Sequence, residues 1–385
     1  MRLLPGPEHF RVTELEAYPP EGAGEHLYVW LEKVGANSDE VADALARATG
    51  RPRRDVGYAG RKDRVAIARQ WFSVRLGEEP KLSRLESPRG GRIEVLRVSR
   101  HRNKLRLGHL RGNRFQLGLA DAEGEWARQA LAGALERLAH CGIENRFGAQ
   151  RFGHGGINLP LARAWGASDF ARAAALCVDP QGDWRPGDPL PAEFRPGLLG
   201  RVVGALRRRP EDAEGALRAA GPGFAKLVAS AAQSAVFNAV LDARRDAGLS
   251  HAVRAGDVLR RAGGGLFRCA PADAADAERR AAPGRLELFL TGPLPGCDVF
   301  AAGPEVTREE RAWSAGCGVD WAWLETGPLG SPGERRPLVV PFLEPPKLEA
   351  AEGVTWLELA LPPGSYATEV LSQCGVAGRV SSDDA

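Results

Sequence analysis

Residues 26–33 alternate between two sets of positions, which predicts a β-strand. One face of this strand carries Leu27, Val29 and Leu31, and the other carries Tyr28 and Trp30. A helix is predicted next, because Asn37 and Glu40 have the spacing of a capping box and Gly50 follows the apolar stripe as a stop. The β-rich run 69–76 then predicts a second strand, which the chain enters from a glycine-rich turn.

The remaining elements are predicted from the same periodicities. Alternation after Asn113 indicates another strand, and residues 123–141 have the period of an amphipathic helix that ends at Gly142. The side chains expected on its buried face are Trp126, Ala130, Leu131, Ala134, Leu135 and Leu138. Helices are also predicted over 224–245, around 304–316 and near the C-terminus, and strands over 337–343 and 354–361.

Length and composition bear on the number of domains. The chain has 385 residues, more than one hydrophobic core usually supports, so two domains are expected. From about residue 160 to 303 the sequence becomes rich in proline, glycine, alanine and arginine, which indicates a separate and less regular module. We therefore predict a domain made of residues 1–156 and 304–385, interrupted by an inserted domain of residues 157–303.

Hydrophobic residues make up 43% of the chain and charged residues 26%, as in ordinary soluble globular proteins. The six cysteines lie far apart without a C-x-x-C pair, so neither a zinc knuckle nor a thioredoxin-type site is indicated. No segment has the unbroken apolar length of a signal peptide or a membrane-spanning helix. A soluble cytoplasmic protein with free thiols is expected.

The net charge of +3 is small, but positive charge is concentrated in one segment. Residues 97–114 contain no acid and seven cations, which are Arg97, Arg100, Arg102, Lys104, Arg106, Arg111 and Arg114. A local basic field of this kind attracts polyanions and makes their binding salt-dependent.

The most distinctive candidate for chemistry is Asp63, which lies among Arg61, Lys62 and Arg64 on the glycine-rich turn 57–64. Neighbouring cations favour the ionised carboxylate, so Asp63 could act as a nucleophile or a base, and the same cations could hold a phosphate backbone. The alternative is a structural turn residue that bonds its own backbone.

Phe115 and the segment 145–156 are the other candidates. Phe115 fits a core position, or a stacking platform for a base beside the cations of the basic segment. Glycine, arginine, amide and aromatic residues alternate over 145–156 and could bring guanidinium groups to phosphate. A dinucleotide-binding loop is disfavoured there, because the third glycine of GxGxxG is missing and no strand precedes it.

Three motifs occur in order along the chain. The first is Gly60-Arg61-Lys62-Asp63, followed by Gln70-Trp71, the second falls within 100–115, and the third is the segment 145–153. Together they closely resemble the signatures of the TruD family of tRNA pseudouridine synthases. Further similarity spans most of the chain, at 7–12, 24–26, 231–238 and 361–368. The lysine that this family often has before the first of these segments is absent, since Leu4-Pro5-Gly6 precede Pro7.

The resemblance implies an α+β fold, in which a pseudouridine synthase catalytic domain with a central mixed or antiparallel sheet is interrupted by a TruD-type insertion domain. It also implies isomerisation of a tRNA uridine, at position 13 in the D arm, so that ribose C1′ is joined to C5 of uracil instead of N1. The target base must leave its stack to expose the glycosidic bond. No cofactor and no metal is expected, and the partner is tRNA, bound by a monomer.

By the same resemblance, Asp63 is the essential carboxylate, which either attacks the sugar or removes a ribose proton. Phe115 would stack on the target uracil and Asn113 would hydrogen-bond near it. The cations Lys62, Arg61 and Arg151 would keep Asp63 ionised or hold adjacent phosphates.

Two other classes of function use some of the same residues. A protein that only binds nucleic acid needs the basic segment and a stacking aromatic, but it has no use for an aspartate facing phosphates. A glycosidase needs a pair of carboxylates, and no second acid accompanies Asp63 in its motif.

Overall fold

The computed structural model describes residues 1–76, 82, 84–87, 89–120, 124–190, 197–327 and 331–377. Contacts divide the chain into a first unit, Met1–Ile143 with Pro341–Ala385, and a second unit, Glu144–Val340. The second unit is wider than the predicted insertion 157–303, because helix α9 (Pro304–Ser314) packs on α7 (Pro222–Asp246) and strand β13 (Glu334–Pro337) pairs with β12 (Leu288–Leu294). The boundaries at 156 and 303, as limits of independently folding domains, stay predictions.

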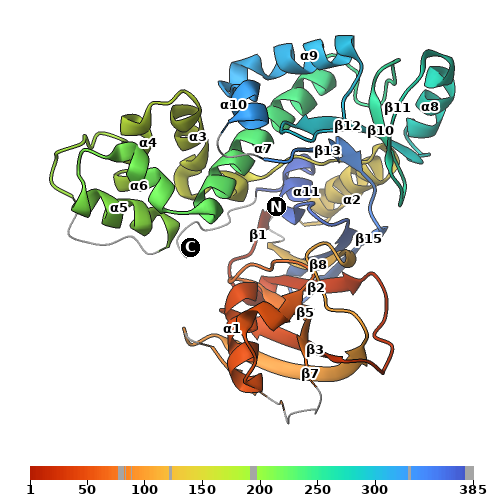
Figure 1. Ribbon diagram of the computed structural model, residues 1–385. Helices are drawn as coiled ribbons and strands as arrows, with labels where there is room; N and C mark the ends of the chain where they lie inside the picture. The colour runs from red at the N-terminus through yellow and green to blue at the C-terminus, as the bar shows by residue number, and fades with distance from the viewer. Residues whose placement is uncertain are drawn as a thin grey trace. The chain divides into compact units, whose positions relative to one another are not determined.

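A mixed sheet is the frame of the first unit (Figure 1). Its strands follow the order β15-β16-β8-β2-β5-β3-β7-β6, with β1 beside β8 and β4 beside β5. Strands β2 and β5 are parallel and the other pairs antiparallel, which confirms the predicted mixed sheet. Its strands are β1 (Arg2–Leu3), β2 (Phe10–Glu16), β3 (His26–Val34), β4 (Val56–Tyr58), β5 (Ile67–Arg75), β6 (Arg84–Glu86), β7 (Arg92–His101), β8 (Leu110–Ala120), β15 (Glu344–Ala351) and β16 (Val354–Leu361).

Helix α1 (Ser38–Thr49) covers one face of this sheet (Figure 1). The predicted capping box of Asn37 and Glu40 is present, and Gly50 ends the helix in the left-handed conformation with φ of 63°. Val41 and Leu45 of α1 pack in one core cluster with Leu27, Val29 and Leu31 of β3. The predicted strand, its apolar face and the following helix are therefore confirmed.

Helix α2 (Gly124–Cys141) forms where an amphipathic helix is predicted, but part of its predicted buried face is wrong. Trp126 is 73% exposed, and Ala130 is exposed as well. The buried residues are Ala127, Leu131, Ala134 and Leu135. The contact face thus follows the 127-131-134 positions, and Trp126 lies about 100° away from it in the first turn of the helix. The predicted start at Glu123 lies outside the described residues.

The second unit combines helices with a small antiparallel sheet of order β11-β10-β12-β13. Its helices are α3 (Asn158–Gly166), α4 (Phe170–Val178), α5 (Leu198–Arg208), α6 (Ala213–Ala219), α7 (Pro222–Asp246), α8 (Ala274–Ala281), α9 (Pro304–Ser314) and α10 (Trp321–Thr326). Its strands are β10 (Val258–Arg261), β11 (Leu266–Arg268), β12 (Leu288–Leu294), β13 (Glu334–Pro337) and β14 (Val339–Val340), and β9 (Ile143–Glu144) spans the boundary between the two units.

The single strand predicted over 337–343 is wrong, because β13 ends at Pro337 and β14 has only two residues. The strand predicted over 354–361 is β16, and the helix predicted near the C-terminus is α11 (Ala367–Gln373).

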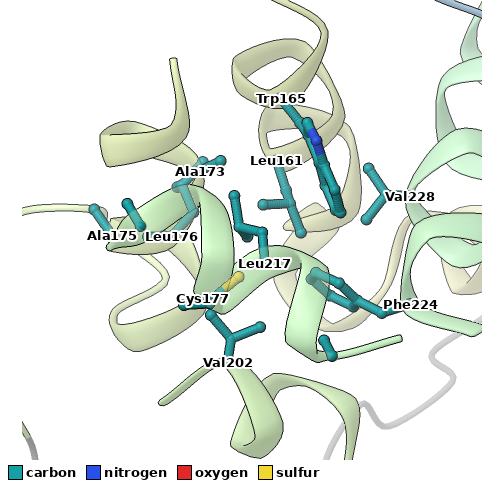
Figure 2. Packing of buried hydrophobic residues seen from close by; sticks show 14 of the residues in the cluster. Leu161, Trp165, Ala173, Ala175, Leu176, Cys177, Val202, Leu217, Phe224 and Val228 are labelled. Carbon is teal, nitrogen blue, oxygen red and sulfur yellow. The ribbon is translucent and has the colours of Figure 1, made fainter. Parts of the chain in front are cut away.

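Helices α3 to α7 enclose an apolar core (Figure 2). Leu161 and Trp165 of α3, Cys177 of α4, Leu217 of α6 and Phe224 of α7 meet there (Figure 2). Helix α7 is long and apolar enough to cross a membrane by length and composition, but 67% of its apolar stretch is buried, as in the core helix of a globular unit. The segment predicted to be irregular therefore contains well-packed helices in its described part.

Candidate active site

Asp63 is exposed on a turn whose backbone is fixed by two buried polar side chains, Ser38 of α1 and Gln70 of β5. Ser38 Oγ accepts a hydrogen bond from the main-chain N–H of Lys62 at 2.8 Å and donates one to Gln70 Oε1 at 2.9 Å. Gln70 Nε2 donates to the carbonyl of Gly60 at 3.0 Å. The helix and the strand together hold the turn in place and leave the Asp63 side chain facing solvent.

Lys62 points away from solvent and forms a buried ion pair with Glu14 of β2. Lys62 Nζ lies 3.4 Å from Glu14 Oε2, and the two side chains are 3% and 1% exposed. Burial lowers the pKa of Lys62 and raises that of Glu14, and each charge opposes the shift of the other. A Cβ atom on Gly60 would lie 2.9 Å from Lys62 Nζ, so a larger residue there would press on the buried ammonium group. Lys62 is therefore neutralised by Glu14 and is not placed at the surface for a phosphate.

Arg64 is also engaged within the protein. Its guanidinium group donates to Glu40 of α1 and, at 2.9 Å, to the carbonyl of Gly35, and the N–H of Gly35 donates to the Arg64 carbonyl at 3.1 Å. Glu40 is the capping-box residue of α1, so the same carboxylate holds the helix start and the residue after Asp63. The Arg64 cation is largely compensated by this carboxylate.

Lys33 of β3 is the buried cation that the motifs do not predict. It is 0% exposed, and its ammonium group donates a hydrogen bond to the main-chain carbonyl of Asp63. Burial lowers the pKa of Lys33 to about 7, and the negative charge of Asp63 opposes that shift. The sequence contains a signal for it, because Lys33 continues the alternation of Leu27, Val29 and Leu31 and so lies on the buried face of β3.

Asn113 and Phe115 of β8 lie on the same face of the sheet as Glu14. In the antiparallel pair of β2 and β8, Asn113 lies opposite Glu14 and Phe115 lies opposite Val12, and opposed residues share a face. Phe115 is 8% exposed and meets Phe10 edge-on at 6.2 Å between ring centroids. Asn113 Oδ1 is buried and has no hydrogen-bond partner in the described structure. The sheet therefore brings Asn113 and Phe115 to the side on which Lys62 meets Glu14.

The last two candidate cations differ in position. Arg61 is exposed next to Asp63. Burial raises the pKa of the Tyr58 hydroxyl, and the hydrogen bond and charge of Arg61 oppose that shift. Arg151 lies in the second unit, where its Nε donates to Ser234 Oγ at 3.1 Å and its guanidinium carbon lies 5.3 Å from the centre of the Phe147 ring. Arg61 thus belongs to the Asp63 turn, whereas Arg151 belongs to the signature 145–153 of the other unit.

That signature packs on helix α7 of its own unit. The main-chain N–H of Phe147 donates to Asn238 Oδ1 at 3.0 Å, and the Phe147 carbonyl accepts from Asn238 Nδ2 at 3.0 Å. Arg146 pairs with Asp242, also on α7. Several of the polar groups over 145–156 that suggested phosphate binding therefore make contacts within the unit instead.

The basic segment 97–114 is closer to neutral than its sequence suggests, since acids from other segments pair with several of its cations. Glu21 pairs with Arg102, and Glu344 pairs with Arg111 and Arg114. Arg97 is exposed and lies over the Trp71 ring, 6.0 Å from its centroid. In the described part of the chain, no group of three or more His, Cys, Asp and Glu side chains could hold a metal ion.

Comparison with known families and proteins identifies relatives along nearly the whole chain. The family model for tRNA pseudouridine synthase D (TruD) matches residues 1–184 and 199–374. The tRNA pseudouridine synthase D of Geobacter sulfurreducens is 38% identical over 95% of this chain and 92% of its own length. The enzyme of the same name from a strain of Thermus thermophilus is 35% identical over 95% of this chain and 86% of its own length.

A solved structure has the same fold. It is the crystal structure of a Methanosarcina mazei protein assigned to tRNA pseudouridine synthase D, and it aligns with a TM-score of 0.70 at 25% identity. The alignment covers 97% of this chain and 92% of that one. This match confirms the predicted α+β fold class.

Proposed function

Because the chain belongs to the TruD family of tRNA pseudouridine synthases, we propose that it isomerises uridine 13 in the D arm of tRNA, with Asp63 as the essential carboxylate. One observation carries this proposal: Asp63 is exposed on a turn that buried groups hold from beneath. Such preorganisation suits a group that must meet a sugar atom in one geometry.

The reaction breaks the bond between N1 and C1′ and forms one between C5 and C1′. The uracil gains a proton at N1 and loses the one at C5, so the product is an isomer and no electrons are exchanged. Asp63 supports this either by attacking C1′ or by removing a ribose proton, and each route frees the uracil to rotate. Both routes require the ionised carboxylate.

Asn113 and Phe115 are proposed to hold the uracil during rotation. Asn113 Oδ1, which has no partner among the described residues, suits a donor such as uracil N3–H, because a buried acceptor without a partner is costly. Phe115 would offer its ring to the base. Since Phe115 is 8% exposed in the free protein, stacking on the base requires its ring to become more accessible.

The three candidate cations are proposed to have different roles, two in contact with RNA and one inside the protein. Arg61 is exposed and suits a contact with a phosphate next to the flipped nucleotide. Arg151 is proposed to contact the tRNA from the second unit. Lys62 acts through its pairing with Glu14 rather than by touching RNA. The enzyme is further inferred to be cytoplasmic and to work as a monomer. Gel filtration with and without tRNA would check the monomeric state.

Mapping pseudouridine in tRNA tests the proposal. Cells that lack the endogenous activity would receive the wild-type gene or Asp63→Asn. The wild type is expected to restore pseudouridine at position 13 and the variant is not, although both proteins bind tRNA. Equal modification by the two proteins would refute the role of Asp63, and binding without modification by either would leave a protein that only binds RNA.

A further inference from the structure

The buried or partly buried cations around the Asp63 turn differ in whether a carboxylate is paired with them. Lys62 is matched by Glu14, and Arg64 by Glu40. Lys33 has no carboxylate among its hydrogen-bond partners in the described structure, and its ammonium group donates to the main-chain carbonyl of Asp63. It is buried completely on β3, so no solvent compensates its charge.

We propose that Lys33 is the positioning residue of this active site: its buried ammonium group fixes the backbone of Asp63 through the Asp63 carbonyl and places a positive charge beneath the turn. The inference rests on the proposed role of Asp63. The site is built from two sides, because Ser38 and Gln70 hold the turn at Gly60 and Lys62, and Lys33 holds it at Asp63 itself.

The charged groups that face Lys33 come from two elements and the turn. Asp63 and Glu40 favour its protonated form, whereas Lys62 and Arg64 oppose it. Lys62 is itself paired with Glu14, which reduces the repulsion from that neighbour. Together with burial, these groups place the protonation of Lys33 within the pH range of an assay, at a pKa of about 7.

The chemical consequence is a site that is active while Lys33 is charged. As the pH rises, loss of the ammonium proton removes the positive charge beneath the turn and leaves a weaker donor for the Asp63 carbonyl. The turn then loses its fixed position, and misplacement of a reacting group by about 1 Å can lower the rate by about 100-fold. Affinity for tRNA depends on surface contacts and should change little.

The experiment compares Lys33→Met, Lys33→Arg and wild type with a tRNA transcript under single-turnover conditions between about pH 5.5 and about pH 9.5, a range that brackets the lowered pKa. Lys226→Met, an exposed lysine on α7, serves as the control substitution. We expect Lys33→Met to lower the maximal rate about 100-fold with tRNA affinity within about twofold of wild type. The fall in rate at high pH should be present in wild type, absent in Lys33→Met and moved to higher pH in Lys33→Arg, because arginine keeps its charge.

Thermal unfolding separates this role from a purely structural one. Lys33→Met removes a buried charge and leaves no buried carboxylate unpaired, so its melting temperature should not fall. A full rate in Lys33→Met, or a loss of rate that is matched by a loss of folding, would overturn the proposal. Failure of the proposed function itself looks different, since wild type would then form no pseudouridine at any pH.

Discussion

Arg335 and Glu310 in the second unit are as deeply buried as Lys62 and Glu14 in the first, with both side chains 2% exposed. The Arg335 guanidinium group bonds both oxygens of Glu310, at 2.9 and 2.8 Å, and its other donors reach the Thr291 hydroxyl and carbonyl at 3.2 Å. Lys62 reaches Glu14 through one contact of 3.4 Å. Arg335 of the second unit thus makes four hydrogen bonds, two of them to its carboxylate partner, whereas Lys62 of the first unit makes one long contact with its own.

This difference distinguishes scaffold from active site. Arginine cannot lose its proton within a protein, so a buried arginine demands complete pairing, whereas a buried lysine can shift its pKa and remain partly satisfied. The second unit shows the same pairing through both carboxylate oxygens between Arg244 and Asp257. The lysines of the first unit lie next to Asp63, where electrostatic strain can serve a reaction rather than stability.

Glu310→Ala should have the largest effect on stability. It leaves Arg335 buried and charged without its carboxylate, which costs about 3–5 kcal/mol of unfolding free energy. Because arginine stays protonated, the loss should be the same at about pH 6 and about pH 9. Urea unfolding of the full chain measures it, and a loss below about 1 kcal/mol would show that the pair is not the structural anchor described here.

Glu14→Ala should cost less, about 2 kcal/mol near neutral pH. Without Glu14, the already lowered pKa of Lys62 falls further, so Lys62 can shed its proton at a modest cost. A lysine whose folded-state pKa is depressed destabilises the protein most below that pKa, and stability recovers as pH rises towards the unfolded value. The loss of unfolding free energy in Glu14→Ala should therefore be smaller at about pH 9 than at about pH 6. A loss that does not change with pH would contradict the contrast with Glu310→Ala.

Lys33 should give the wild type a rising stability with pH. Its pKa is about 7 in the folded protein and about 10.4 when unfolded, so between these values the unfolded chain binds more protons. Its contribution to the unfolding free energy then rises by at most about 1.4 kcal/mol per pH unit from about pH 7 upwards. Denaturant titrations at several pH values should show this slope in wild type and a smaller one in Lys33→Met. Equal slopes would mean that Lys33 is not a buried charge.

Glu309→Ala should have the smallest effect, within about 1 kcal/mol. Glu309 neighbours Glu310 in sequence, but its partner Arg254 is 35% exposed and Glu309 itself 42%, so water compensates the loss. The same unfolding assay therefore contains a matched control for Glu310→Ala. A loss as large as that of Glu310→Ala would show that exposure does not decide the strength of these pairs.

Patterns within one segment predicted much of this architecture. The capping box at Asn37, the alternation of β3 and the position of Asp63 before a strand are set by local chemistry, and the structure has each of them. Pairing between distant segments could not be predicted. Neither the acid that meets Lys62 nor the acids that meet the basic segment lie near those cations in sequence. The exposure of Trp126 was missed for a related reason, since only the packing of α2 decides which of its faces is buried.

Lys33 shows where sequence reasoning could have gone further. A lysine on the buried face of a strand contradicts the pattern around it, and such contradictions tend to occur at functional sites. Recognising it needs only the alternation from Leu27 to Leu31, but its contact with the Asp63 carbonyl depends on the fold of residues 30 positions apart.

The most direct test of the central claim is the single-turnover rate of pseudouridine formation at uridine 13 by Asp63→Asn, with Asp43→Asn on the exposed side of α1 as a matched control. The substitution removes the carboxylate charge and nearly preserves its shape. A fall of about 1,000-fold or more is expected for Asp63→Asn, with tRNA affinity retained and the control at the wild-type rate. A rate within about tenfold of wild type for Asp63→Asn would contradict the account.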